Sequence, residues 1–238
     1  MALKEIEYNN KKFQISYTIV GDSKKSIVFL HGWGSNKEVM KGSFGNKLKD
    51  FKHIYIDLPG FGSSPNNSNV LTTKDYANIV KIFLDKIRVN PDIIAGHSFG
   101  GKVATLLNPQ KLVLLSSAGI LVPKPINVKL KIAIVKLLKP FKIQSLIKLF
   151  VSKDAKDMNL AMYETFKNVV DEYFEDNFKK YSGKALLFWG KEDSATPLWS
   201  GEKISKLIQN SKFYPLDGDH FFFVNNSNFI AQTIEQEF

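Results

Sequence analysis

The sequence predicts an α/β protein whose mostly parallel central sheet is flanked by helices, and two patterns support this prediction. Apolar runs of strand length recur along the chain, at 26–30, 54–56, 93–95, 111–115 and 185–189. Stretches with helical character separate most of them, at 38–50, 72–88, 101–107 and 202–209. Continuous apolar runs are typical of strands buried on both faces, and strands that alternate with helices form parallel sheets.

Two further segments and one interruption complete the predicted organisation. Residues 12–19 alternate apolar and polar side chains with period two, as expected of a strand toward the sheet edge. Residues 213–216 form a late strand close to the C-terminus. The alternation of strands and helices stops between Gly119 and about Gly183. We therefore predict a core formed by 1–118 and 184–238, interrupted by a helical lid at 119–183.

Composition narrows the class of protein. The 238 residues are 44% hydrophobic and contain no cysteine, so the core can be sizeable and neither disulfides nor thiolate chemistry is available. The N-terminus carries early acidic residues and lacks the apolar stretch of a signal peptide. The longest apolar run, 112–122, falls short of the ~18 residues of a membrane span. We expect a cytoplasmic protein with no transmembrane segment.

The most informative motif is the turn Gly96–Gly100, which reads G-x-S-x-G around Ser98. It follows the apolar run 93–95 and precedes a helical segment, which is the context in which this motif holds a nucleophilic serine on a sharp turn. The glycines allow the strand and the helix to approach closely. The N-terminus of the helix then provides free N–H groups for developing negative charge.

A serine nucleophile needs a base, and the chain has four histidines. His220 lies alone on a loop after the last strand and is the predicted base, with a core histidine beside three phenylalanines as the alternative. His31 lies in a tight glycine-containing loop and is expected to be structural. His53 opens a strand and is expected at the surface. His97 is the variable residue of the serine turn and should face away from the chemistry or line the pocket.

The acid that orients the base is predicted to be Asp193, which follows a strand end. The order Ser98, Asp193, His220 is that of a hydrolase triad built on a parallel sheet. Asp57, at an earlier strand end, is expected to be structural and is kept as a minor alternative for the acid. The oxyanion hole needs two N–H donors, and the backbone N–H groups of Phe99 and Trp33 are the candidates.

Five sequence blocks carry a resemblance to the α/β-hydrolase superfamily over essentially the whole chain. In order they are His31–Gly34, Asp57–Ser63, Gly96–Gly101, Trp189–Asp193 and His220–Phe221. The resemblance implies the α/β-hydrolase fold with a lid, and a cofactor-free, metal-free serine hydrolase. A carboxylesterase that works through an acyl-enzyme is the expected activity.

Within that superfamily, the first two blocks resemble those of the pimeloyl-acyl carrier protein methyl ester esterases of biotin synthesis. That resemblance implies an acidic or carrier-linked ester as substrate. Two alternatives stay open: a C–C bond hydrolase of the meta-cleavage type with the same triad, and a hydrolase-like receptor for a small ligand. A serine at the nucleophile position argues against epoxide hydrolases and dehalogenases, which attack through a carboxylate.

The first half of the predicted lid is strongly basic. Residues 121–153 contain eight lysines and no acid, against a formal net charge of +10 for the whole chain. The pattern fits a solvated lysine face over an apolar underside, or a surface for an acidic carrier protein, an anionic membrane surface or an acidic substrate. The candidate contacts are Lys129, Lys136, Lys142 and Lys148. No nucleic-acid-binding motif accompanies the charge, so nucleic acid is not an expected partner.

Overall fold

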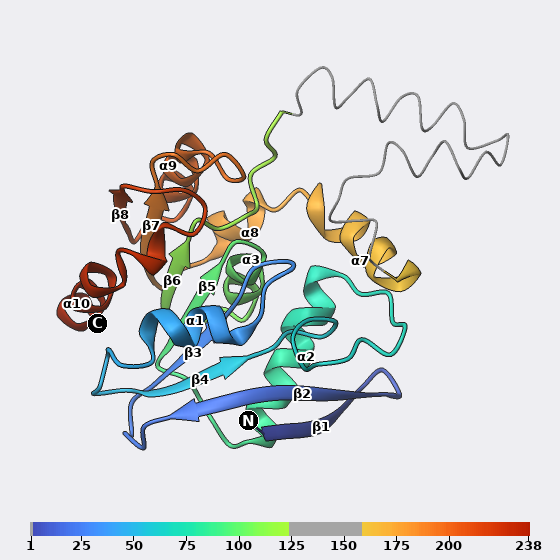
Figure 1. Ribbon diagram of the computed structural model, residues 1–238. Helices are drawn as coiled ribbons and strands as arrows, with labels where there is room; N and C mark the ends of the chain where they lie inside the picture. The colour runs from blue at the N-terminus through green and yellow to red at the C-terminus, as the bar shows by residue number, and fades with distance from the viewer. Residues whose placement is uncertain (1, 124–158) are drawn as a thin grey trace, which may run out of the picture.

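The computed structural model describes residues 2–123 and 159–238, which form an eight-stranded sheet between two layers of helices (Figure 1). The strand order is β1-β2-β4-β3-β5-β6-β7-β8. The pairs β1·β2 and β2·β4 are antiparallel, and every pair from β4 to β8 is parallel. The mostly parallel sheet predicted from the alternation is confirmed. The strands are β1 (Ala2–Tyr8), β2 (Lys11–Val20), β3 (Ser26–Leu30), β4 (Lys52–Ile56), β5 (Ile93–His97), β6 (Lys111–Leu115), β7 (Lys184–Gly190) and β8 (Ser211–Leu216).

The helices are α1 (Lys37–Phe44), α2 (Thr73–Lys86), α3 (Phe99–Leu106), α7 (Leu160–Val170), α8 (Glu175–Lys180), α9 (Leu198–Leu207), the 3-10 turn η2 (Phe222–Val224) and α10 (Ser227–Glu237). The helices predicted at 38–50, 72–88, 101–107 and 202–209 correspond to α1, α2, α3 and α9, whereas the C-terminal helix α10 was not predicted. The prediction of one helix over 38–50 is wrong in its second half, because α1 ends at Phe44 and Leu48 has a left-handed φ of 49°. Helix α9 begins earlier than the predicted 202, directly after Pro197, whose fixed φ suits a helix start.

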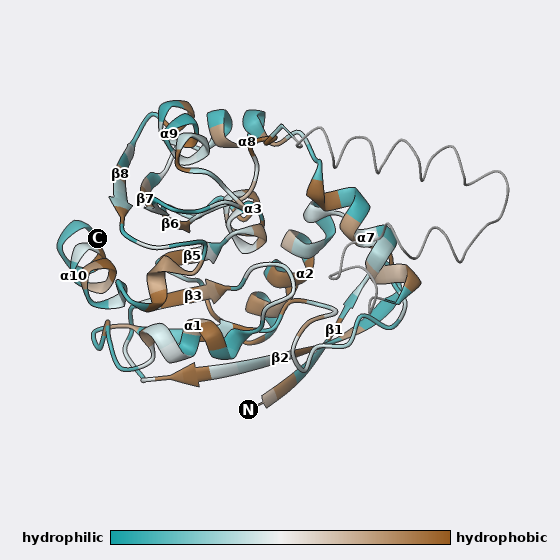
Figure 2. Cartoon of the chain, turned by 45° about the horizontal axis from the view of Figure 1, so that its top comes forward, coloured by the Kyte–Doolittle hydropathy of each residue, from teal (hydrophilic) through white to brown (hydrophobic). Residues whose placement is uncertain are grey.

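Two hydrophobic clusters bury the two faces of the sheet. In β3, Val28 and Leu30 face the cluster that contains α2, α3 and α9, whereas Ile27 and Phe29 face the cluster that contains α1 and α10. All five residues of β3 are buried, as its continuous apolar run predicts. Figure 2 shows the central strand β3 in hydrophobic colours.

The parallel strands bring the candidate site together at one edge of the sheet. Because parallel strands end on the same side, the loops after β3, β5, β7 and β8 meet there, as ligand sites of such sheets do. Helices α7 and α8 lie in sequence between β6 and β7, and α7 contacts the chain ahead of α2 where Leu71 N–H donates to Thr165 Oγ1 (3.0 Å).

The predicted lid at 119–183 is described only at its two ends. Residues 124–158, with Lys129, Lys136, Lys142 and Lys148, lie outside the described residues, so the division into core and lid stays a prediction. Within residues 2–123 and 159–238, none of the helices has the length and apolar character needed to cross a bilayer.

Candidate active site

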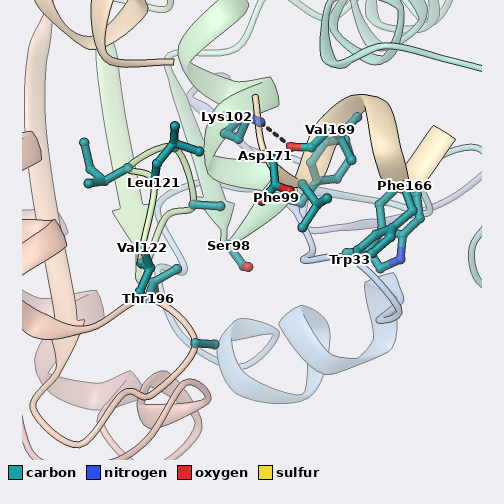
Figure 3. A pocket seen from close by; sticks show the side chains of 15 residues that line it. Trp33, Ser98, Phe99, Lys102, Leu121, Val122, Phe166, Val169, Asp171 and Thr196 are labelled. Atoms are coloured by element: carbon teal, nitrogen blue, oxygen red, sulfur yellow. Dashed lines mark hydrogen bonds between the residues drawn. The ribbon is translucent and has the colours of Figure 1, made fainter. Parts of the chain in front are cut away.

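Ser98 occupies a strained turn between β5 and α3. Its φ of 50° and ψ of −116° lie in a region that non-glycine residues rarely adopt and that clusters at functional sites. The glycines are a steric requirement: a Cβ on Gly96 would overlap the Gly100 carbonyl, and a Cβ on Gly100 would overlap the carbonyl of Leu30. Ser98 is partly exposed, and its side chain points into a pocket (Figure 3).

Asp193 and His220 form the second part of the site. Asp193 follows β7, His220 follows β8, and the Nδ1–H of His220 donates to Asp193 Oδ2 over 2.7 Å. The other carboxylate oxygen accepts from the backbone N–H groups of Ala195 and Thr196, each at 2.8 Å. Asp193 is almost fully buried, whereas the His220 side chain is 20% exposed. Both carboxylate oxygens of Asp193 therefore accept hydrogen bonds, one from the imidazole and the other from the backbone.

The ionisation of Asp193 suits an orienting acid. Burial by itself would raise the pKa of its carboxyl, but the hydrogen bonds from His220 and Thr196 outweigh burial and lower the pKa to about 2. The group is consequently a carboxylate at neutral pH. Its charge would stabilise an imidazolium on His220 and hold the tautomer in which Nε2 is free to accept a proton.

His220, the candidate base, lies beside the serine turn, but no hydrogen bond joins it to Ser98. The ring of His97, which directly precedes Ser98, lies with its centroid 4.6 Å from that of His220. Among the hydrogen bonds of the described residues there is none between Ser98 Oγ and His220. Such bonds are commonly long in a free enzyme and tighten when substrate binds.

Thr196 is a site residue that the sequence patterns did not single out. Its hydroxyl bonds to Asp193 Oδ2 at 2.8 Å and to the Ser116 carbonyl at 3.1 Å, and lies 3.4 Å from His220 Nδ1. The sequence signal that could have indicated Thr196 is its spacing from Asp193. Aspartate side chains commonly accept hydrogen bonds from backbone N–H groups two and three residues later, in a turn of this kind. Thr196 thus braces the carboxylate against the end of β6.

The two predicted oxyanion donors lie at the start of α3 and in the loop after β3, both next to the serine. Phe99 is the first residue of α3, so its N–H has no acceptor within the helix. The loop before Trp33 is in direct contact with the turn, because a Cβ on Gly32 would come within 3.0 Å of Ser98 Cβ. The backbone N–H of Trp33 makes no hydrogen bond with any other described residue. Both groups are thus available to a ligand atom.

A cavity of about 360 Å³ opens from Ser98, and its walls are mainly apolar (Figure 3). Trp33, Phe99 and Phe166 contribute aromatic walls, with the Trp33 ring centroid 5.5 Å from Phe99 and 5.3 Å from Phe166. Val169 and Ile120 extend the apolar lining. The volume lies at the small end of the range found for ligand pockets.

Lys102 closes one side of that cavity and ties α3 to the segment after α7. Its buried ammonium pairs with Glu172 at 2.6 Å and donates to the Val169 carbonyl at 2.8 Å. Burial lowers the pKa of Lys102, and the Glu172 carboxylate opposes that shift. The helix that begins at the serine is therefore joined directly to the residues that line the other wall.

Two of the remaining histidines are structural. His31 Nδ1–H donates to the Gly32 carbonyl and its Nε2 accepts from Leu58 N–H, so the ring fixes the loop after β3, in line with its expected role. The surface position expected for His53 is wrong: it is 2% exposed and bonds to the Leu48 carbonyl and the Tyr55 hydroxyl. It lies on the face of β4 that α1 covers.

The burial of two histidines predicts acid lability. Burial lowers the pKa of His97 to about 3 and that of His31 to about 4. Both titrate near 6.5 in an unfolded chain, so between these values the unfolded state binds more protons. The free energy of unfolding should therefore fall as the pH drops from about 6 to about 4, by about 1.4 kcal/mol per pH unit for each histidine.

Urea unfolding at three pH values measures the slope of the free energy of unfolding against pH. His97→Gln should make it shallower by about 1.4 kcal/mol per unit, and an unchanged slope would contradict the assignment.

Asp57, the minor alternative for the acid, is engaged elsewhere. Its carboxylate pairs with the buried Lys37 ammonium at 2.6 Å and accepts from the backbone N–H groups of Lys37 and Ser63. Burial opposes ionisation, but these bonds outweigh it and lower the pKa of Asp57. In the part of the chain that the structure describes, no three His, Asp or Glu side chains are grouped to hold a metal ion.

The family model described as alpha/beta hydrolase family matches residues 27–232. The match runs from β3 into α10 and takes in Ser98, Asp193 and His220. The chain therefore belongs to the alpha/beta hydrolase family, and it is a hydrolase.

Two relatives and one solved structure illustrate the membership. The uncharacterized hydrolase YugF of Bacillus subtilis is 26% identical, over 81% of this chain and 82% of that protein. The pimeloyl-[acyl-carrier protein] methyl ester esterase of Wigglesworthia glossinidia brevipalpis is 30% identical, over 81% of this chain and 70% of that protein. Est816, described as an N-acyl homoserine lactone degrading enzyme, superposes with a TM-score of 0.75 at 18% identity and covers 99% of this chain and 100% of its own. At that identity the superposition supports the fold alone.

Proposed function

We propose that the protein is a serine carboxylesterase that cleaves acyl esters through an acyl-enzyme. Ser98 attacks the ester carbonyl, and His220 takes the serine proton and donates it to the leaving alcohol. His220 then activates a water molecule that hydrolyses the acyl-enzyme and releases the acid, while Asp193 orients the ring throughout. The backbone N–H groups of Phe99 and Trp33 bind the oxyanion. The observation that carries the proposal is the 2.7 Å bond between His220 and a buried Asp193, at the sheet edge where the strained Ser98 turn faces a cavity.

The ester bond is favoured by the site and by the relatives. The cavity beside Ser98 is apolar over most of its wall, as an acyl chain requires. A relative that covers most of this chain is named as a methyl ester esterase. We therefore propose an acyl ester as substrate, with an acidic or carrier-linked acyl group as the narrower form.

A fluorophosphonate probe combined with an ester panel tests the proposal. The wild type should be labelled at Ser98, identified by peptide mass, and should turn over p-nitrophenyl esters continuously. Esters of increasing acyl length should show a cut-off, because the cavity is limited to about 360 Å³. Labelling with a single turnover would instead favour the receptor alternative. Cleavage of a vinylogous keto acid with no ester turnover would favour the C–C hydrolase.

The lysine-rich segment predicts a dependence on substrate charge. Eight lysines without a counter-acid raise the local positive potential, which speeds encounter with anions and is screened by salt. The ratio of kcat/KM for an acyl carrier protein ester to that for a neutral short ester should fall as ionic strength rises from ~0.02 to ~0.3 M.

Charge-neutral variants provide the control for that prediction. Replacing Lys129, Lys136, Lys142 and Lys148 together by Gln should raise KM for the carrier ester and leave the neutral ester nearly unchanged. If the ratio of the two kcat/KM values does not change with salt or with these substitutions, the lysines form only a solvated surface and do not contribute to substrate binding.

A further inference from the structure

We propose that His97, the variable residue of the serine turn, is a positioning residue that fixes the backbone of His220 and thereby aims its ring at Ser98. The inference rests on the proposed function. Its first support is a hydrogen bond between His97 Nε2 and the carbonyl oxygen of His220, at 3.0 Å. A carbonyl only accepts, so Nε2 carries the proton and donates. This bond joins the last residue of β5 to a residue 123 positions later in the chain.

The ring of His97 is held in place on several sides. It is 2% exposed, and its centroid lies 4.6 Å from that of His220, 5.2 Å from Phe221 and 4.8 Å from Phe223. On the side of the loop after β3, a Cβ on Gly32 would come within 2.9 Å of Nδ1. The loops after β3 and β8 therefore meet at this one imidazole at the end of β5, and the imidazole is carried by the residue next to the candidate nucleophile.

Two anchors are needed to orient the base. Asp193 holds Nδ1 of the His220 ring, but a single hydrogen bond leaves the ring free to pivot about it. The bond from His97 fixes the main chain from which that ring projects. Together they define the direction of Nε2, the atom that must reach the serine hydroxyl. Misplacing a reacting group by about 1 Å can cost about 100-fold in rate.

Two substitutions distinguish the effect of the N–H donor of His97 from the effect of its planar ring. His97→Gln keeps an N–H donor at a similar reach, whereas His97→Phe keeps a planar ring and loses the donor. We expect His97→Phe to lower kcat on a neutral p-nitrophenyl ester by about 10- to 100-fold. KM should change little, because His97 is not among the residues that line the cavity. His97→Gln should recover most of the rate. Rates are taken per site titrated with fluorophosphonate, so that unfolded protein is not counted.

His53→Phe is the matched control. His53 is also buried and also bonds to a backbone carbonyl, that of Leu48, but it lies on β4 away from the site. Its replacement should lower Tm without lowering kcat. If Phe does not fit beside Gly32, His97→Leu is smaller, also lacks a donor and gives the same comparison.

The outcomes separate the inference from the proposed function. Normal wild-type turnover with an unchanged kcat in His97→Phe overturns the positioning role alone, as does a Gln variant no better than Phe. A wild type that is neither labelled nor active on esters overturns the proposed function, and the positioning role with it. The inference is supported if kcat falls in His97→Phe, recovers in His97→Gln and is unchanged in the His53→Phe control.

Discussion

Ser98→Ala should abolish ester hydrolysis and fluorophosphonate labelling while leaving the protein folded. Loss of a serine nucleophile typically costs about 10⁴-fold or more in rate. The hydroxyl of Ser98 makes no hydrogen bond within the described residues, so its removal should change the free energy of unfolding by less than ~1 kcal/mol. Turnover of p-nitrophenyl esters and urea unfolding measure the two quantities. A folded alanine variant with wild-type turnover would show that another residue is the nucleophile.

Ser98→Gly provides a control on the backbone of the same turn. With φ at 50° and ψ at −116°, a non-glycine residue carries strain of the order of 1 kcal/mol or more. The glycine variant should therefore be inactive and at least as stable as the alanine variant, although glycine also makes the unfolded chain more flexible. A marked loss of stability relative to alanine would mean that the strain is absent.

Asp193→Asn and Asp57→Asn should affect different quantities. An amide facing His220 Nδ1 favours the wrong imidazole tautomer, so Asp193→Asn should lower kcat by about 10⁴-fold. Asp57→Asn removes the buried charge that pairs with Lys37, whose side chain is 3% exposed, and leaves the ammonium only the exposed Glu38 carboxylate at 3.7 Å. That loss should lower the free energy of unfolding by about 3 kcal/mol with kcat near wild type.

Both variants are compared on one neutral ester and by urea unfolding. A large loss of kcat in Asp57→Asn together with an active Asp193→Asn would move the acid to the earlier strand end. Asp193→Asn should also lower the free energy of unfolding. The hydrogen bonds that depress the pKa of the Asp193 carboxyl stabilise the folded state above about pH 4, and this stabilisation is lost as the pH falls through about 2. At neutral pH, Asp193→Asn should therefore lower both quantities, whereas Asp57→Asn lowers one.

The sequence predicted the central strands and the serine turn because their signals are local. The apolar run of β3 is buried at every position, and the G-x-S-x-G spacing is dictated by contacts within the turn and with the neighbouring strand. The alternation of strands with helices predicts that the central strands are parallel, but it does not give their order in the sheet. These features need no knowledge of distant partners.

The elements that the sequence did not reveal depend on distant contacts. Strand β1 (Ala2–Tyr8) buries only Ile6 and is held by pairing with β2, so its residues carry little apolar pattern. His53 follows a lysine and looked exposed, but α1 covers that face and its ring lies 5.7 Å from Phe29. The contact of Thr196 with Ser116 spans 80 residues, which no local pattern records.

The close approach of Gly32 to Ser98 has a consequence for redesign of substrate range. Any side chain at Gly32, Gly96 or Gly100 collides with main-chain atoms or with the serine turn. In a library of variants, substitutions at these three positions should therefore almost never give an active enzyme. Phe166 and Val169 lie on α7, across the cavity, and their side chains can be exchanged without moving the turn. Selection for new acyl specificity should therefore enrich changes on α7 and leave the three glycines untouched.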